Sequence, residues 1–407
     1  MKDNKLQLIK AGSTSVINAL GELIFTYALS LKLLKVTGSA LGYGTSLFIG
    51  PIVGLLLAPT IGKVIDSYPH KKLAIIAQFL LIAVLTLYLF AYTVLRTPIF
   101  YTAIVAVILI NIFSRLFSIT YLSSTPQIVS KSSIQRLNSI QTTGVATASI
   151  IGAPIAGFLF GVIPFQFIIL IEIITEFLTL LITWRTSFDE IKPRKNKSNS
   201  DNSNKPKVLD ILLGQPQLLI LIFTAMALNL SGISLQIGVP YVLLHTLKYS
   251  TIVSGNVEGI ASFGVLIGGF IISLITIKHV FNFARKIYEL SAILPLLLGI
   301  FIKVIPSYTL ILFATFEFIS SFMGAISDPP IFTYIQEVIP GEALGRVNTM
   351  TYTMVEILNP VGVLIYSTLF SKLNYQTVFL FNGIITALLI GILFVYLNNL
   401  LNRKQNI

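Results

Sequence analysis

The sequence predicts an all-α membrane protein with twelve transmembrane helices arranged as two six-helix bundles. Three observations predict this fold class. The mean hydropathy of the 407 residues is +0.86, and only 11% of them are charged. This composition excludes a protein made of several soluble domains. Apolar stretches long enough to cross a hydrocarbon core about 30 Å thick recur from end to end. A polar segment near the middle of the chain divides these stretches into two groups of six.

Each apolar stretch gives an expected helix in chain order. The expected ranges are 12–33, 39–61, 73–94, 98–123, 138–161, 165–184, 216–242, 250–276, 287–304, 308–329, 347–370 and 374–397. The first range is too long and too polar for the apolar core of a signal peptide, and it lacks a small-residue cleavage site. It is therefore expected to be retained as the first transmembrane helix.

The segment 185–210 is rich in Lys, Asn and Ser and is too polar to bury a core, so it is expected to be a cytoplasmic linker. It separates an N-terminal six-helix bundle, residues 1–184, from a C-terminal one, residues 211–407. The halves also look related, because RLNSI begins at Arg136 just before the fifth expected helix and RVNTM begins at Arg346 just before the eleventh. Two halves in the same order and orientation form the parallel repeat of one class of secondary transporter.

Lys and Arg residues predict the orientation. With the N-terminus placed in the cytoplasm, 21 of the 28 basic residues fall in the termini and the cytoplasmic loops. This bias predicts a multi-pass protein of the plasma (cytoplasmic) membrane with both termini cytoplasmic. The net charge of +12 does not indicate nucleic acid as a partner, because the basic residues lie in the gaps between apolar stretches. The chain has no cysteine, which excludes disulfides and thiol catalysis.

Residues 61–76, IGKVIDSYPHKKLAII, place charges between two apolar runs. Gly62 and Asp66 are four residues apart, so they share a face if the second helix extends this far, and the glycine permits close approach of a neighbour. A carboxylate at the C-terminal end of a helix interacts unfavourably with the helix dipole, so Asp66 needs a partner elsewhere. In the alternative interpretation, Asp66 is an exposed loop charge and Lys71 and Lys72 only fix the orientation.

The spacing G-x-x-x-D-x-x-x-x-K-K, formed by Gly62, Asp66, Lys71 and Lys72, resembles the cytoplasmic signature of the major facilitator superfamily. Three longer segments resemble the macrolide-efflux branch of that family, which also includes siderophore exporters. These segments are 37–76, 124–141 and 336–350. The resemblance implies the major facilitator fold, with the first, fourth, seventh and tenth helices around a central cavity.

The same resemblance implies a conformational latch formed by Gly62, Asp66, Lys71, Lys72 and Arg346. In the family, the aspartate of this signature contacts the start of the eleventh helix in one conformation and helps to close the cytoplasmic side. This sequence has Ser67 where the family usually has a basic residue directly after the aspartate. Part of the usual charge network is therefore expected to be missing.

Charged side chains within the expected helices are costly in hydrocarbon and are functional candidates for that reason. We expect proton coupling or cavity lining from five of them: Glu22, Arg115, Glu258, Glu317 and Glu356. The family fold would place Glu22, Arg115 and Glu317 around one water-filled cavity, where a carboxyl group can exchange protons. Glu22 is the foremost candidate. The alternative for each is a hydrogen-bond partner between helices, or a position near the membrane interface.

Two features resemble drug/proton antiporters. Arg115 resembles the fourth-helix arginine that takes part in proton transfer in that family, although the glycines that normally follow it are replaced by residues 116–120, LFSIT. A structural salt bridge to a neighbouring glutamate is the alternative role of Arg115. The segment GAPIAG resembles a degenerate glycine- and proline-rich motif of antiporter fifth helices, in which Gly152, Pro154 and Gly157 would permit a bend and tight helix contact.

Three further acidic residues have weaker indications. Glu172 and Glu176 lie one turn apart on the sixth expected helix and could share a proton, but the peripheral position of sixth helices in this fold favours packing or interface roles. Asp328 is expected to end the tenth helix, because Pro329 and Pro330 follow it and cannot donate the backbone hydrogen bonds of a helix. A gating contact is the alternative role of Asp328.

Motifs of other functional classes are absent from the sequence. There is no G-x-x-x-x-G-K-[ST] loop, which argues against ATP as the energy source, and no H-E-x-x-H or other metal-binding pattern. We therefore expect neither an enzyme nor a protein with a cofactor or a metal site. The expected partners are a small-molecule substrate, protons and the lipid bilayer. The sequence leaves the oligomeric state open and favours a monomer.

The function that these observations favour is secondary active transport by alternating access. The resemblance favours proton-coupled export of a hydrophobic or amphipathic small molecule, as in drug or macrolide efflux. An uptake permease or a flippase for a lipid-linked substrate would have the same fold and charges. A membrane receptor or scaffold that transports nothing is an alternative of another class, but it leaves several buried charges unexplained.

Overall fold

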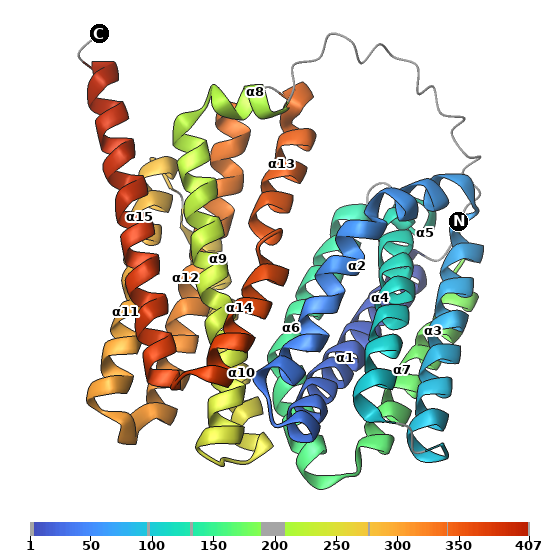
Figure 1. The fold of residues 1–407 in the computed structure, drawn as a ribbon. Coiled ribbons are helices and arrows are strands. Elements are labelled where there is room, and N and C mark those ends of the chain that lie inside the picture. The colour runs from blue at the N-terminus through green and yellow to red at the C-terminus, as the bar shows by residue number, and fades with distance from the viewer. Residues whose placement is uncertain are drawn as a thin grey trace. The chain divides into compact units, whose positions relative to one another are not determined.

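The described part of the protein consists of helices and the turns that join them, with no strand in it. The structure is a computed structural model that describes residues 4–95, 98–130, 133–188, 208–275, 277–339 and 341–405. Most of the expected linker, 185–210, lies outside these residues. The helices and their order along the chain can be followed in Figure 1.

The chain divides into two compact units, and each is described by itself. Unit 1 comprises Met1–Ser198 together with Tyr249–Gly259, and unit 2 comprises Asn199–Lys248 together with Ile260–Ile407. The helices of the first half of the chain are α1 (Asn4–Thr37), α2 (Ala40–Ser67), α3 (His70–Thr93), α4 (Ile99–Ser123), α5 (Thr125–Ile128), α6 (Ile134–Val162) and α7 (Phe165–Arg185).

The second half begins with the short helix α8 (Val208–Leu213). It continues with α9 (Pro216–Tyr241), a π-helical turn (Val242–Thr246), α10 (Thr251–Leu274), α11 (Val280–Val304), a 3₁₀ turn (Pro306–Tyr308), α12 (Thr309–Val338), α13 (Gly341–Glu356), α14 (Asn359–Lys372) and α15 (Tyr375–Gln405). The N-terminal part of α10, up to Gly259, belongs to unit 1.

The structure confirms the fold class and is consistent with twelve membrane helices. Eleven helical segments in the described residues are long and apolar enough to cross a membrane, and the apolar part of α2, Ala40–Gly54, is a shorter twelfth. Serine and threonine hydroxyls within these segments mostly bond to a carbonyl one turn earlier, as Ser30 does to Thr26 and Thr120 does to Leu116. Such bonds satisfy hydroxyl groups that would otherwise lack a partner in hydrocarbon.

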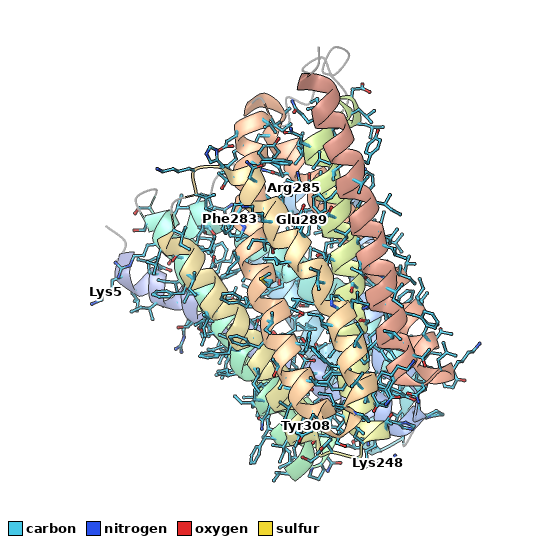
Figure 2. All side chains as sticks on the ribbon, turned by 90° about the vertical axis from the view of Figure 1, so that its left-hand side faces the viewer. Lys5, Lys248, Phe283, Arg285, Glu289 and Tyr308 are labelled. Carbon is cyan, nitrogen blue, oxygen red and sulfur yellow. The ribbon has the colours of Figure 1, made fainter. Side chains whose placement is uncertain are left out.

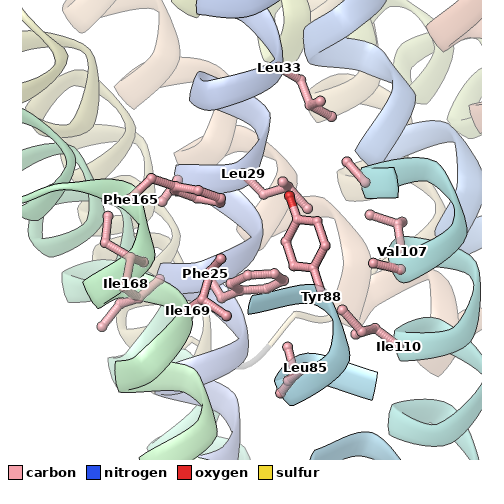
Figure 3. Packing of buried hydrophobic residues seen from close by; sticks show 14 of the residues in the cluster. Phe25, Leu29, Leu33, Leu85, Tyr88, Val107, Ile110, Phe165, Ile168 and Ile169 are labelled. Carbon is pink, nitrogen blue, oxygen red and sulfur yellow. The ribbon is translucent and has the colours of Figure 1, made fainter. Parts of the chain in front are cut away.

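The core of unit 1 is a cluster of apolar side chains from α1, α2, α3, α4, α6 and α7, part of which is drawn in Figure 3. Phe25 of α1 stacks on Phe165 of α7, with ring centroids 6.4 Å apart. In a membrane, close packing of this kind rather than the exclusion of water holds helices together. The helix α7 packs against both α1 and α3, and it is thereby fixed relative to the charged residues of α1.

Unit 2 has an equivalent core. Its buried apolar side chains come from α8, α9, α11, α12, α13 and α15. The helix α15 packs against both α9 and α11, as α7 does against α1 and α3 in unit 1. The two units therefore share the arrangement in which the last helix contacts the first and the third.

Several helices extend beyond their expected ranges, and the extensions of α11 and α12 have clear physical reasons. The helix α11 begins at Val280 rather than at residue 287, because Arg285 and Glu289 form an ion pair of 2.8 Å across one turn and stabilise the charged segment as a helix (Figure 2). The prediction that Asp328 ends the tenth helix was wrong, since α12 continues through Pro329 and Pro330 to Val338. Buried side chains that follow the two prolines, Ile331 among them, pack into the core of unit 2 and hold this part of α12 helical.

The eleventh expected helix, 347–370, is instead broken. The helix α13 ends at Glu356 and α14 begins at Asn359, with Pro360 in the first turn of α14. A proline at this position lacks only an N–H group that would have no partner at a helix start, so it favours a new helix here. Arg136 lies in the first turn of α6 and Arg346 lies in the second turn of α13, rather than just before these helices.

Candidate functional site

Glu22 lies on α1 within unit 1. Its side chain is partly buried, and its Oε1 accepts a hydrogen bond of 3.1 Å from Ser114 Oγ of α4. The neighbouring residues Ile24 and Phe25 belong to the apolar core. The carboxyl group is therefore held in place by α4 while part of its surface stays accessible.

Arg115 follows Ser114 on α4 and lies close to the same carboxyl. Its guanidinium group is packed directly on the backbone of α2 at Gly54, where an added Cβ would lie only 2.6 Å from Nη2. The positive charge acts on the Glu22 carboxyl. The structure thus brings Glu22 and Arg115 together in one unit, with the glycine of α2 making room for the arginine.

The contact between α2 and α4 repeats one turn earlier. A Cβ added at Gly50 would lie 2.8 Å from Oδ1 of Asn111, so the glycines at 50 and 54 face Asn111 and Arg115 at the same spacing of four residues. Small residues four apart allow two membrane helices to approach closely. This glycine pair of α2 positions α4, and with it the residues that contact Glu22.

Two more carboxyl groups lie near Glu22, on α7. Glu172 is 3% exposed and Glu176 is 1% exposed, and both side chains lie inside unit 1 rather than on its outer surface. Asn18 Nδ2 donates a hydrogen bond of 2.8 Å to Glu176 Oε1. Glu22 is close enough for its charge to act on both α7 carboxyls. The three glutamates therefore form one acidic cluster between α1 and α7.

The remaining acidic candidates lie elsewhere in the chain. Glu258 is partly buried on the portion of α10 that belongs to unit 1. Glu317 is 8% exposed on α12, and Glu356 at the end of α13 accepts a hydrogen bond from Asn359 Nδ2. Glu317 and Glu356 belong to unit 2, so they are not part of the cluster around Glu22.

The predicted latch lies only partly within the described residues. The side chains of Asp66 and Arg346 are outside them. Gly62 is exposed, and a Cβ added there would meet nothing within 4 Å. Lys72 is exposed, whereas Lys71 Nζ donates a hydrogen bond of 2.8 Å to the carbonyl of Thr186 at the end of α7. Lys71 therefore ties α3 to α7, a contact that the sequence did not indicate.

The glycine- and proline-rich motif of α6 is a site of tight helix contact within unit 1. A Cβ added at Gly157 would lie 2.5 Å from the carbonyl oxygen of Thr251 on α10, and Thr251 Oγ1 donates a hydrogen bond of 2.9 Å to the Gly157 carbonyl. Gly152 faces Leu23 of α1, and Pro154 lies inside the helix. The motif thus places α6 between α1 and the start of α10.

Sequence reasoning missed the polar partners of the acidic residues. Ser114, Asn18 and Gln78 contact or face the carboxyl groups, and each is a polar residue within an expected membrane helix. Their position in the membrane was the available signal, since polar side chains there generally have partners. Within the described residues no three His, Cys, Asp or Glu side chains lie together as metal ligands would. What the acidic cluster can do chemically is bind and release protons.

Three solved structures show the fold of this chain in other proteins. A bacterial homologue of the iron transporter ferroportin in an inward-facing state has a TM-score of 0.75 at 15% identity, over 97% of this chain and 99% of that one. A bacterial metal transporter gives 0.70 at 14% identity, over 97% and 98%. A D-xylose–proton symporter gives 0.65 at 15% identity, over 94% and 96%. At these identities the similarity shows the fold alone.

The sequence itself identifies the family. No curated protein matches the chain in sequence. The sequence profile of the Major Facilitator Superfamily matches residues 11–358, which is most of the chain. The proteins of this family are membrane transporters and not enzymes. The chain belongs to the major facilitator superfamily.

Proposed function

We propose that the protein is a secondary active transporter that exports a hydrophobic or amphipathic small molecule, as in drug or macrolide efflux, in exchange for protons. Transport would proceed by alternating access. The observation that carries the proposal is the partly buried Glu22, hydrogen-bonded to Ser114 and within reach of the Arg115 charge. Such a carboxyl group is suited to change its protonation state during a transport cycle.

The chemistry of this site supports proton exchange. A carboxylate in a low-dielectric environment is costly unless a counter-charge or hydrogen bonds stabilise it, and protonation removes the cost. Arg115 supplies a counter-charge to the ionised form, and Ser114 supplies a hydrogen bond. Both states of Glu22 therefore have a structural basis, and the partial exposure of the side chain provides a route for the proton.

The substrate class rests on composition and on the resemblance to the macrolide-efflux branch. The chain is 55% hydrophobic and 11% aromatic, so a cavity in it would bind mainly through apolar and aromatic contacts. The similar structures are named for metal, iron and xylose transport, and at 15% identity or less they do not assign a substrate here. The xylose structure is named as a proton symporter, which supports proton coupling as compatible with this fold.

The other candidates complete the proposal. Glu317, Glu258 and Glu356 would contribute to the cavity or to coupling, and Asp66 would close the latch against Arg346. The protein would lie in the plasma membrane with both termini in the cytoplasm, following the distribution of Lys and Arg residues.

Accumulation of fluorescent amphipathic compounds in cells tests this function. Cells that contain the protein should accumulate less of at least one compound in a broad panel than cells without it. Adding a protonophore should remove the difference. Glu22→Gln should behave like absence of the protein while inserting normally, because the amide cannot exchange a proton. Glu289→Gln is the matched control, since Glu289 is 41% exposed and pairs with Arg285 on α11.

Three outcomes would each contradict a different part of the proposal. Equal accumulation across the whole panel would contradict export of this substrate class and would favour uptake or a lipid-linked substrate. Export that persists in the presence of the protonophore would contradict proton coupling. Full export by the Glu22→Gln variant would remove Glu22 from the mechanism.

A further inference from the structure

The proposed transport cycle makes no use of Glu172 and Glu176, although they are the two most deeply buried carboxyl groups described in unit 1. They lie one turn apart on α7, at 3% and 1% exposure. The carboxyl of Glu172 lies against the backbone of α1, where a Cβ added at Gly21 would be 2.6 Å from Oε2. Glu176 lies beside Asn18 of α1 and Gln78 of α3. The pair is therefore enclosed by the two helices against which α7 packs.

Hydrogen bonding in this enclosed region is incomplete. Among the described residues, Glu176 Oε2 has no hydrogen-bond partner, and neither Oε1 nor Nε2 of Gln78 has one. Gln78 is fully buried, at 0% exposure, and its carboxamide faces the Glu176 carboxyl. Buried polar atoms without partners are rare in folded proteins and cost free energy. Gln78 offers both an unpaired donor and an unpaired acceptor, so its carboxamide can pair with the Glu176 carboxyl whether that group is ionised or protonated.

The second half of the chain shows what the fold requires at the equivalent position. Residues 165–176 at the start of α7 (FQFIILIEIITE) align without a gap with residues 375–386 at the start of α15 (YQTVFLFNGIIT). The alignment pairs Glu172 with Asn382 and Glu176 with Thr386. Because α15 packs against α9 and α11 as α7 does against α1 and α3, the aligned residues occupy equivalent places in the two units.

In unit 2 this position is neutral and its central side chain is fully hydrogen-bonded. Asn382 Nδ2 donates to Ser231 Oγ at 3.0 Å and to Ser234 Oγ at 2.8 Å, and Asn382 Oδ1 accepts from Tyr366 Oη at 2.5 Å. Uncharged side chains are therefore sufficient to form the hydrogen bonds that join α15 to its neighbouring helices at this position. Packing alone gives no reason for two carboxyl groups at the equivalent place in unit 1.

Among the described residues, no cation is positioned to neutralise the pair. Of the titratable groups that face α7, α1 contributes Glu22, and α3 contributes Tyr88, whose buried hydroxyl has no partner among the described residues, and Tyr92, whose ring contacts Phe165. The two lysines that contact α7 bind its last carbonyls instead, Lys10 at Arg185 and Lys71 at Thr186. On α6, the third helix packed against α7, the titratable side chain is Arg136, which is exposed.

From this geometry we propose that Glu172 and Glu176 form a buried proton-binding site that holds one proton, with Gln78 as the hydrogen-bond acceptor. Two ionised carboxylates one helical turn apart repel each other strongly when they are buried, because no water screens their charges. One bound proton removes this repulsion and stabilises the pair. When the proton is on Glu176 Oε2, that atom donates to Gln78 Oε1, and both unpaired oxygens acquire a partner. The ligand is a proton rather than a metal ion, because the described side chains provide no cluster of metal ligands.

The protonation of this pair is coupled electrostatically to the protonation of Glu22. Because Glu22 acts electrostatically on both members of the pair, loss of a proton from one group makes loss from the others less favourable. A proton held by the pair therefore lowers the cost of ionising Glu22. The proton site does not depend on the proposed export function, since it follows from unit 1 alone and holds for any substrate.

Infrared spectroscopy of the purified full-length protein in detergent tests the site without a substrate. A protonated carboxyl group has a C=O stretching band that is separate from the bands of carboxylates and amides and shifts in D₂O. At neutral pH, where exposed carboxyl groups are ionised, the wild-type protein should show this band. The part of this band that comes from the pair should be missing from the Glu172→Gln/Glu176→Gln variant, as a wild-type-minus-variant difference spectrum shows, whereas the Glu289→Gln control should leave the band unchanged. Gln78→Leu, which keeps both carboxyls, should shift the band to the frequency of a carboxyl without a hydrogen bond.

The outcomes separate this proposal from the proposed function. The Glu22→Gln variant should retain the band of the pair while losing proton-coupled export. Identical neutral-pH spectra for the wild-type protein and the double variant would overturn the proton site, whatever the export assay shows. If the double variant does not fold, an unchanged band in Gln78→Leu overturns it instead. Loss of the wild-type band on adding sodium chloride but not choline chloride would identify a metal cation as the ligand and would also overturn it.

Discussion

Gly21 of α1 is the residue that allows a carboxyl group to lie between α1 and α7. A side chain at this position would collide with Glu172, whose Oε2 would lie 2.6 Å from the added Cβ, and with Thr175 one turn along the same face of α7. Gly21 is buried, and the Cβ of Thr175, which the backbone of α7 holds in place, would lie only 2.9 Å from the added atom. The smallest side chain on α1 thus determines where the acidic cluster forms.

Replacing Gly21 by alanine should destabilise the protein. We expect a loss of about 1–3 kcal/mol, the usual cost of overpacking, from the free energy of unfolding. The matched control is Gly391→Ala on α15, where an added Cβ meets nothing within 4 Å. Because alanine favours helix more than glycine does, this control should leave stability unchanged or raise it by up to about 1 kcal/mol. Thermal unfolding in detergent compares the two, and equal midpoints would contradict the packing described at Gly21.

At the scale of the element, α7 is anchored at its C-terminal end by two lysines. Lys10 Nζ donates to the Arg185 carbonyl at 2.9 Å, and Lys71 Nζ donates to the Thr186 carbonyl at 2.8 Å. Lys71 also lies 5.9 Å from the centre of the Phe188 ring. Cations at this end of a helix interact favourably with its dipole and satisfy carbonyls that have no partner within the helix.

Lys71→Ala should lower stability more than Lys72→Ala does. Both changes remove one basic residue from the same short segment, so their effects on membrane orientation are matched, but Lys72 is exposed. We expect a difference of about 0.5–1.5 kcal/mol, the usual net contribution of one hydrogen bond. Thermal unfolding of the two purified variants measures it. A Lys72→Ala variant that is as destabilised as Lys71→Ala would show that the anchoring of α7 contributes nothing.

The contact between α6 and the start of α10 is a second feature of element scale. A Cβ added at Gly255 would lie 2.6 Å from the Ala153 carbonyl oxygen and 3.2 Å from the Cα of Gly157. These neighbours are backbone atoms, which cannot rotate away as a side chain can. The two helices can approach this closely only because glycine is present on both.

Gly255→Ala should therefore cost about 1–3 kcal/mol in the free energy of unfolding. Gly269→Ala is the control on the same helix, because a Cβ there meets nothing within 4 Å. The comparison uses unfolding midpoints in detergent. If Gly255→Ala were as stable as the control, the close contact within unit 1 would be wrong.

At the scale of the whole molecule, hydropathy predicted the fold because each membrane helix must be long and apolar on its own. Hydropathy predicted both ends of α7 and of α9 to within one residue. It failed where packing overrides local preference, as in α12, whose continuation past Pro329 and Pro330 depends on contacts in the core of unit 2. The start of α11 was missed because its charged residues pair with each other inside the helix.

The candidate site could be predicted only in part. Glu22 and Arg115 stand out in sequence because an ionised side chain in a membrane helix is costly. Their partners, such as Ser114 and Gly54, could not be identified, because the rotation of one helix against another is not encoded in the period of a single helix. The same limit applied to Glu172 and Glu176, which the expected position of the sixth helix assigned to packing or an interface.

The two halves of the molecule share their helix arrangement but differ in chemistry. Unit 1 holds the cluster of Glu22, Glu172 and Glu176, whereas Asn382 and its neutral partners stand at the equivalent junction of unit 2. An ancestral repeat can keep its packing while only one copy acquires ionisable groups. Unit 1 is thus the half in which we place the proton-binding pair of Glu172 and Glu176.

The most direct test of proton-coupled transport uses the purified protein in liposomes with an imposed pH gradient and no other energy source. A fluorescent amphipathic compound that the protein exports from cells should accumulate inside vesicles with an acidic lumen, as exchange for protons requires. Accumulation should be absent without the gradient and in Glu22→Gln, and normal in Glu289→Gln. Equal uptake with and without the gradient, or full uptake by Glu22→Gln, would contradict proton coupling through Glu22.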